Sequence, residues 1–238
     1  MSSLLLIHGA WSAPSIWSPL IAQLDLDVNV RVVELPSTSN PDADLRDDVH
    51  SVLLATKDLE GSAITALGHS YGGAVLRAAA SGIPNLVHAI FLAALVPRGG
   101  ESATDASRRI RQRTLIDEAI TLDGPWLRLS TPLAAEALAG DATAEQQQRL
   151  VDSLRPQSHK SFLQPVPASQ WEGRVSYVAC ARDQALSYEL QCAQVPSGAT
   201  QINLDSDHCP MVSHPVELAA ILGKLMTPVE TTESVLLL

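Results

Sequence analysis

The stretch from Ala63 to Leu76 constrains the fold more than any other part of the chain. It begins with a short apolar run, which is typical of a buried strand, and continues into an alanine-rich segment of high helix propensity. Between the two lies Gly68-His69-Ser70-Tyr71-Gly72. Glycines at these two places let a strand and a helix pack closely, and the turn pushes the serine hydroxyl clear of the sheet. The pattern therefore predicts an exposed serine nucleophile between a strand and a helix.

Strand-like and helix-like segments alternate on both sides of this turn. Strands are expected before Ser70 and at residues 4–7, 30–33, 87–95, 175–181 and 201–204. Helices are expected from Pro14, from Asp44 to Leu59, after Ser70, and at residues 186–193 and 216–226. This alternation predicts an α/β fold with a mostly parallel central sheet and helices on both faces.

The alternation is interrupted between residues 97 and 167. No strand is evident there, prolines divide the segment into short pieces, and Thr143 with Gln146 forms a capping-box pattern. We interpret residues 97–167 as an inserted helical cap, and residues 1–96 and 168–238 as the α/β core. The tail from Thr227 is expected to be loosely held.

Composition limits the classes of function. The formal net charge of −10 argues against nucleic-acid and anionic-membrane partners, which leaves a small molecule as the expected partner. The 3 cysteines form no C-x-x-C pair, and no signal peptide or membrane span is readable, so a reducing, cytoplasmic location is expected. No metal or other cofactor is expected, and the sequence leaves open whether the chain forms a homodimer.

A serine nucleophile needs a base and an acid that orients the base, and around such a turn they follow in the order serine, acid, histidine. His208 lies after the last expected strand and Asp183 at the end of the strand before it, so they are the leading candidates. Asp183 could instead cap the helix from Leu186. The rival acids are Asp205, Asp207 and Glu101, and the other histidines are His8, His50, His69, His88, His159 and His214.

The same chemistry needs two N–H donors for the negative oxygen that forms when the serine attacks. The peptide N–H of Tyr71, directly after the serine, and that of Ala10, in the loop after the first strand, are the candidates. Among the aromatic side chains, Trp11 and Trp126 are the preferred candidates for lining a substrate pocket. Trp17, Phe162 and Trp171 are weaker ones.

These residues resemble the α/β-hydrolase superfamily, and within it the group of plant methylesterases and hydroxynitrile lyases with their bacterial esterase relatives. The resemblance rests on His8-Gly9-Ala10, Gly68-His69-Ser70-Tyr71-Gly72-Gly73, Phe91-Leu92-Ala93-Ala94, Leu154-Arg155-Pro156, Cys180-Ala181-Arg182-Asp183 and Asp207-His208-Cys209-Pro210-Met211. It implies a Ser70, Asp183, His208 triad, oxyanion donors at Ala10 and Tyr71, and a helical lid.

The resemblance also bears on the reaction. Lyases of this group carry threonine where this chain has Gly9, and lysine where it has Cys209. Without that cation, ester hydrolysis by a carboxylesterase or methylesterase is the favoured reading. A lyase-like reaction on the same triad and a small-molecule receptor remain the alternatives. Trp11 and Tyr71 stand where the plant enzymes have cysteine and leucine, which argues against their particular substrates.

Overall fold

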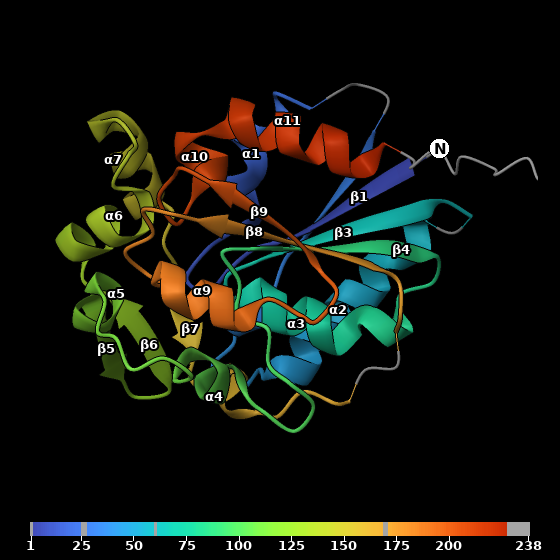
Figure 1. Ribbon diagram of the computed structural model, residues 1–238. Coiled ribbons are helices and arrows are strands. Elements are labelled where there is room, and N and C mark those ends of the chain that lie inside the picture. The colour runs from blue at the N-terminus through green and yellow to red at the C-terminus, as the bar shows by residue number, and fades with distance from the viewer. Residues whose placement is uncertain (1, 25–27, 60, 169–170, 228–238) are drawn as a thin grey trace, which may run out of the picture.

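The computed structural model describes residues 2–24, 28–59, 61–168 and 171–227. Their central element is a six-stranded sheet, which Figure 1 shows in the middle of the molecule. In spatial order the strands are β2 (Asn29–Val33), β1 (Ser2–Ile7), β3 (Ala63–His69), β4 (Leu86–Leu92), β8 (Arg174–Cys180) and β9 (Thr200–Leu204). Every neighbouring pair in this sheet is parallel. All carboxyl ends therefore lie at one edge, where ligands of open α/β sheets bind.

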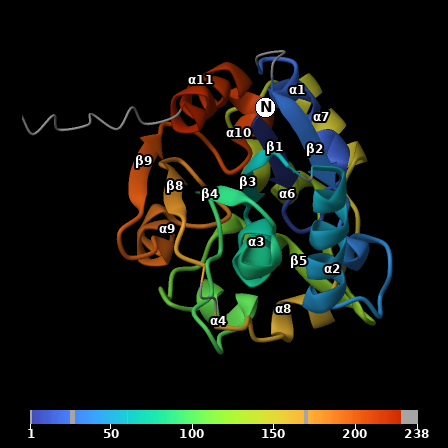
Figure 2. The same cartoon turned by 90° about the vertical axis from the view of Figure 1, so that its right-hand side faces the viewer.

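Helices cover both faces of the sheet, as Figure 2 shows. On one face lie α2 (Leu45–Thr56), α3 (Tyr71–Ala79) and α9 (Tyr188–Gln194); on the other lie α1 (Ser18–Ile21), α10 (Pro210–Ser213) and α11 (Pro215–Met226). Asp44 begins α2 through a capping box with Asp47, which supplies an acceptor for the first turn. The predicted α/β architecture is confirmed.

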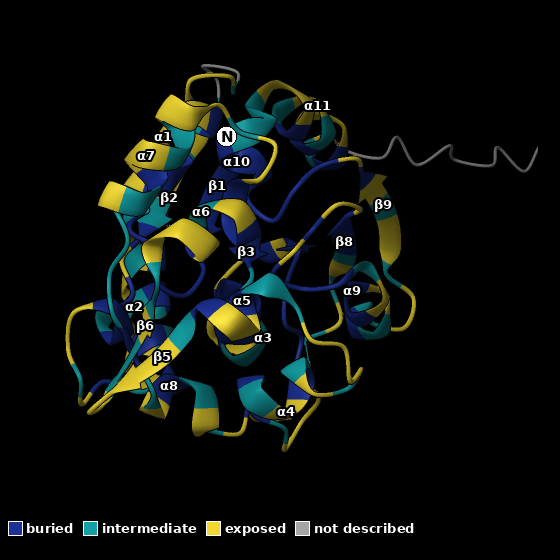
Figure 3. Cartoon of the chain, turned by 90° about the vertical axis from the view of Figure 1, so that its left-hand side faces the viewer, coloured by how far each residue is buried: buried dark blue, intermediate teal, exposed yellow. Residues whose placement is uncertain are grey.

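Burial on both faces explains why the strands read as continuous apolar runs (Figure 3). From Leu4 to Ile7, every residue of β1 is 0% exposed. Strand β4 ends at Leu92, before the expected residue 95, because Ala93 takes a left-handed conformation with φ 42° that turns the chain out of the sheet.

The inserted segment differs from the prediction in one respect. Its helices are α4 (Ala103–Ser107), α5 (Leu115–Ala119), α6 (Thr131–Ala139), α7 (Ala144–Asp152) and α8 (Lys160–Leu163). It also holds a three-stranded antiparallel sheet of β5 (Ile120–Asp123), β6 (Trp126–Leu129) and β7 (Gln157–Ser158), so the expectation of no strand is wrong.

A local signal for this small sheet was present in the sequence. Asp123 pairs with Trp126 across a two-residue hairpin loop that contains Gly124, at φ 57°. Glycine at the first position of a two-residue loop is typical of a type II′ hairpin turn, but strands of 4 residues give little periodicity of their own. The capping box of Thr143 and Gln146 at the start of α7 is confirmed.

Two further expectations concern the chain ends and the membrane. Residues 228–238, which include most of the tail expected to be loosely held, lie outside the described residues. Among the helices that the structure describes, none has the length and hydropathy to cross a bilayer.

Candidate active site

The residues singled out in the sequence gather at the carboxyl edge of the sheet. Ala10 follows β1, Ser70 follows β3, Asp183 follows β8 and His208 follows β9. Four loops from distant parts of the chain are thus brought to one place by the parallel topology.

Ser70 occupies a strained turn between β3 and α3. Its backbone has φ 54° and ψ −121°, outside the regions that side-chain-bearing residues favour. The flanking glycines are required by space: a Cβ on Gly68 would lie 2.5 Å from the carbonyl oxygen of Gly72, and one on Gly72 would lie 2.5 Å from that of His8. Close packing of β1, β3 and α3 therefore forces this geometry on the serine.

His208 and Asp183 are joined by a short hydrogen bond. The Nδ1 atom of His208 lies 2.7 Å from Oδ2 of Asp183, and both side chains are almost fully buried. Asp183 also accepts hydrogen bonds from the N–H groups of Ala185 at 2.7 Å and Leu186 at 2.8 Å, and from the Gln191 amide at 3.0 Å. All three are donors, so they fix the position of the carboxyl group. With Nδ1 donating, Nε2 of a neutral His208 is free to accept a proton.

The alternative role of Asp183, as the N-cap of the helix expected from Leu186, is only partly supported. Asp183 organises the turn through Leu186, whereas the residue that caps α9 is Ser187, which accepts from the N–H of Leu190 at 3.2 Å.

The rival acids have other partners. Asp205 is exposed and paired with Arg182. Asp207 is buried, which raises the pKa of its carboxyl, and it accepts from the N–H of Cys209 and the hydroxyl of Ser213 at 3.0 and 2.8 Å. Glu101 is paired with Arg109. Asp183 is the acid that the structure brings to His208.

Two further buried histidines support the site. The Nε2–H of His69 donates to the carbonyl of His208 at 2.9 Å, and burial lowers the pKa of His69 well below its usual range. His8 donates from Nδ1 to the Gly9 carbonyl at 2.8 Å and accepts from the N–H of Leu35 at 3.3 Å. Burial lowers the pKa of His8 to about 4, so its ring is neutral and shapes the loop that contains Ala10.

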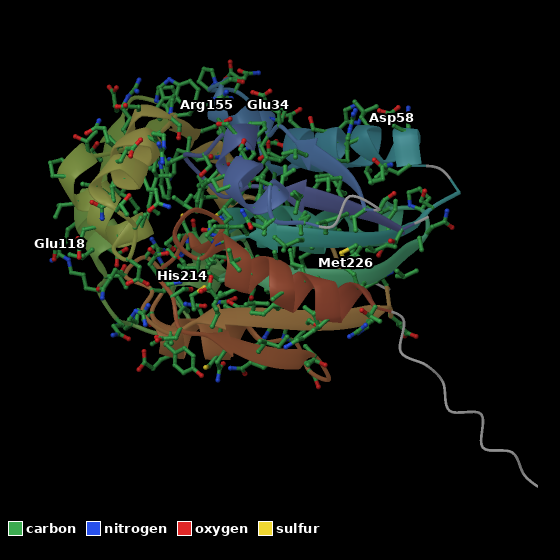
Figure 4. All side chains as sticks on the ribbon, turned by 90° about the horizontal axis from the view of Figure 1, so that it is seen from above. Glu34, Asp58, Glu118, Arg155, His214 and Met226 are labelled. Carbon is green, nitrogen blue, oxygen red and sulfur yellow. The ribbon has the colours of Figure 1, made fainter. Side chains whose placement is uncertain are left out.

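The two candidate oxyanion donors sit at the ends of structural elements. Tyr71 is the first residue of α3, where an N–H has no acceptor within the helix. Ala10 lies in the loop after β1 and lines the cavity that Ser70 lines. The loop is fixed at Trp11, whose carbonyl accepts a hydrogen bond from the backbone N–H of Arg155, in the inserted segment, at 2.8 Å. The guanidinium of Arg155 also pairs with Glu34 at 2.5 Å. Figure 4 labels these two residues next to each other.

Ser70 and His208 open onto one cavity of about 1000 Å³ between the core and the inserted segment. The side chains that line it are of both kinds. The apolar ones include Leu95, Ile116, Ile120, Leu127, Leu138, Phe162, Leu186 and Leu190, and the polar or charged ones include Thr104, Arg108, Arg111, Gln112, Arg113, Asp117 and His159.

The aromatic candidates fall into two groups. Trp11 and Phe162 line the cavity, with ring centroids 6.0 Å apart. Trp126, expected to contact substrate, is outside the set of described residues that line it. Successive strand residues point to opposite sides, and on β6 Leu127 faces the cavity instead, its carbonyl accepting from the Trp11 indole at 3.0 Å. Trp17 is fully buried in the core, and Trp171 borders a separate surface cleft.

Sequence reasoning missed two carboxylates next to the site. Asp48 on α2 accepts from the Tyr71 hydroxyl at 2.8 Å, and Asp141 between α6 and α7 accepts from the N–H of Asp207 at 2.8 Å. Both contacts join segments far apart in the chain. Neither aspartate has a local sequence pattern that indicates its contact.

The comparisons agree with this architecture. The sequence pattern of the alpha/beta hydrolase family matches residues 4–221. The chain is 25% identical over 240 residues to the protein called probable hydrolase R7 of Phoma sp., covering 93% of this chain and 97% of that one.

Two solved structures show the same fold. A pyrethroid hydrolase from Sphingobium faniae JZ-2 is similar with a TM-score of 0.80 and 21% identity, over 94% of this chain and 96% of that one. The methylesterase MES16 from Arabidopsis is similar with a TM-score of 0.77 and 20% identity, over 94% and 98%. Because the family pattern and the fold both extend over nearly the whole chain, this protein belongs to the α/β-hydrolase family.

Proposed function

We propose that this protein is a serine carboxylesterase that cleaves a small apolar ester through Ser70, His208 and Asp183. The observation that carries the proposal is the 2.7 Å contact between His208 and Asp183, at a cavity that also holds the strained Ser70. Nucleophile, base and acid follow in the order that this fold uses.

In the proposed mechanism, His208 takes the proton of the Ser70 hydroxyl at Nε2 while the serine oxygen attacks the ester carbonyl. Asp183 holds the ring in the tautomer that leaves Nε2 unprotonated and stabilises the imidazolium that forms. The N–H groups of Ala10 and Tyr71 stabilise the negative oxygen of the tetrahedral intermediate. His208 then protonates the leaving alcohol, and water attacks the acyl-enzyme with His208 again as base.

The apolar side chains of the lining support an ester with a hydrophobic acyl or alcohol group. The names of the similar proteins, which include a pyrethroid hydrolase and a methylesterase, agree with ester cleavage.

The geometry favours hydrolysis over a lyase reaction. Cys209 follows His208 in the cavity, and a thiol is neutral or negative but never positive, so it supplies no cation to a departing anion. A Cβ on Gly9 would lie 3.0 Å from Cβ of Ser70 and 3.0 Å from Nδ1 of His69. A threonine there would crowd the nucleophile.

The test is turnover of p-nitrophenyl butyrate by the wild type and by Ser70→Ala, with labelling by a fluorophosphonate as a second readout. We expect turnover and labelling in the wild type and neither in Ser70→Ala. Equal turnover by both proteins would refute the mechanism. Tight binding of the ester without turnover would favour a receptor.

A further inference from the structure

A buried carboxylate lies behind the candidate oxyanion hole. Asp48 on α2 is 0% exposed. Its Oδ1 accepts from the N–H of Ser37 at 3.0 Å, and its Oδ2 accepts from the hydroxyls of Ser37 at 2.6 Å and Tyr71 at 2.8 Å. Each of these donors is a neutral group. Burying a carboxylate among neutral partners costs folding free energy. A functional role for Asp48 would therefore act through these contacts.

The first of these contacts leads to one proposed oxyanion donor. Tyr71 contributes its N–H at the start of α3, while its side chain runs into the core and is held at the hydroxyl by Asp48. The ring is also stacked on Phe162 of the inserted segment, with centroids 4.9 Å apart. The side chain is therefore fixed at its tip and on its face, which fixes the backbone that bears the N–H.

The second contact leads toward the other donor. The hydroxyl of Ser37 accepts from the Gln157 amide at 2.8 Å, and Oε1 of Gln157 lies 3.4 Å from the backbone nitrogen of Trp11, which donates to it. Trp11 has φ 58° and directly follows Ala10. Gln157 is fully buried, so this side-chain contact holds the left-handed residue beside the second donor.

We propose that Asp48 is a positioning residue for the oxyanion hole, anchoring Tyr71 directly and the Ala10–Trp11 peptide through Ser37 and Gln157. The proposal rests on the proposed esterase function and adds a group that touches neither the substrate nor the reacting atoms.

All three partners donate to Asp48, an arrangement that favours an ionised carboxylate. A protonated carboxyl would bring a fourth donor and force at least one hydroxyl to turn from donor to acceptor. Burial raises the pKa of Asp48 to about 6. The groups that act on it are Ser37 of the turn η2 (Pro36–Thr38), Tyr71 of α3, and Asp47 of its own helix, whose charge also raises the pKa. Acidification through this range would weaken the anchor.

The experiment compares Asp48→Asn and Tyr71→Phe with the wild type in the full chain. Ser176→Ala is the matched control, since it removes a buried 2.9 Å contact with His88 within the sheet. The readouts are kcat and KM for p-nitrophenyl butyrate and the rate of labelling by a fluorophosphonate, whose phosphonyl oxygen occupies the same hole.

We expect kcat to fall about 10²-fold in Asp48→Asn, the order of effect of displacing or losing one donor. KM should change less than about threefold, because the donors act on the transition state. Labelling should slow in parallel, Tyr71→Phe should lie between Asp48→Asn and the wild type, and Ser176→Ala should keep the wild-type kcat.

The pH profile gives an independent readout. Below about pH 6, kcat of the wild type should fall more steeply than kcat of Asp48→Asn, because Asp48 gains a proton in the wild type and the variant has no carboxyl at this place. Equal steepness in the two proteins would count against the role of Asp48.

The outcomes separate the two proposals. A wild type that is neither active nor labelled at Ser70 refutes the esterase function itself. A Ser70-dependent wild type with normal kcat and labelling in both Asp48→Asn and Tyr71→Phe overturns the role of Asp48. If Asp48→Asn does not fold, Tyr71→Phe decides alone: wild-type kcat and labelling in that variant overturn the proposal, and a parallel loss of both supports it.

Discussion

Asp141 and Asp207 exchange hydrogen bonds between the inserted segment and the core. The N–H of Asp207 donates to Oδ2 of Asp141 at 2.8 Å, and the N–H of Asp141 donates to Oδ2 of Asp207 at 3.0 Å. Asp141 also accepts from Arg182 at 2.8 Å and contacts His214 at 3.2 Å; Figure 4 labels His214 at this boundary. Because Arg182 precedes Asp183 and Asp207 precedes His208, one carboxylate holds both loops.

Replacing Asp141 by alanine should therefore disturb the acid and the base together. We expect kcat for p-nitrophenyl butyrate to fall between about 10-fold and 100-fold, the effect of a small misplacement. The free energy of unfolding should fall by about 1–2 kcal/mol, because several donors lose their acceptor at a partly exposed site. Enzyme kinetics and urea unfolding give the two values.

Asp123→Ala is the control for that variant, since Asp123 forms an exposed pair with Arg128 at the hairpin of the inserted segment. It should leave kcat unchanged and alter stability by less than about 0.5 kcal/mol. Equal effects of the two substitutions would show that Asp141 does not organise the loops.

Disturbing the contact between Asp183 and His208 should lower kcat more than replacing Asp141 does. In Asp183→Asn the amide can donate to Nδ1 and favour the wrong tautomer, so kcat should fall by up to about 10⁴-fold. Asp205→Asn should be nearly silent, because Asp205 is exposed and paired with Arg182. If the two variants exchange these results in a steady-state assay, the acid is Asp205.

The parts of the site that the sequence predicted share a local cause. Ser70 stands out because the strand, the tight turn and the helix are contiguous in the chain, and each has its own signal. Asp183 and His208 could be selected because each follows an apolar strand, and a parallel sheet brings such positions to one edge. This inference holds for any order of the strands in a parallel sheet, so the strand order did not have to be predicted.

The parts that the sequence did not predict depend on contacts across the fold. Asp47 and Asp48 are adjacent acidic residues near the start of α2 and read alike. In the structure Asp47 completes an exposed capping box, whereas Asp48 turns inward to Tyr71. Which of the two is buried depends on how α2 packs on α3. Trp126 and Leu127 present the same problem, because strand pairing decided which side faced the cavity.

The raised pKa of Asp48 also predicts a pH effect on stability. Its pKa rises from 3.8 to about 6 on folding, so between these values the folded protein keeps a proton that the unfolded chain has lost. The contribution of this group to stability is therefore greatest at low pH and declines as the pH rises from about 4 to about 6. Relative to the wild type, Asp48→Asn should gain about 1 kcal/mol of unfolding free energy between pH 5 and pH 7.5.

Urea unfolding of both proteins at the two pH values measures that difference. The hydrogen bonds that the variant lacks are missing at both pH values, so their effect on the unfolding free energy cancels in the comparison. A difference that stays constant, or that shifts in favour of the wild type, would mean that Asp48 is not held with a raised pKa in the folded state.

Alanine substitutions at two helical glycines, Gly72 and Gly223, should change the stability of the protein in opposite directions. A Cβ on Gly72 would lie 2.5 and 2.6 Å from the carbonyl oxygens of His8 and Ile7, and these backbone atoms cannot move without shifting β1. Gly72→Ala should therefore destabilise the protein by about 3 kcal/mol and displace Ser70. Gly223, within α11, has nothing within 4 Å of its Cβ position, so Gly223→Ala should stabilise by about 1 kcal/mol through helix propensity. Thermal unfolding with the esterase assay separates the cases: a Gly72→Ala protein as stable and active as the wild type would contradict the close approach of β1 to α3 on which the geometry of Ser70 depends.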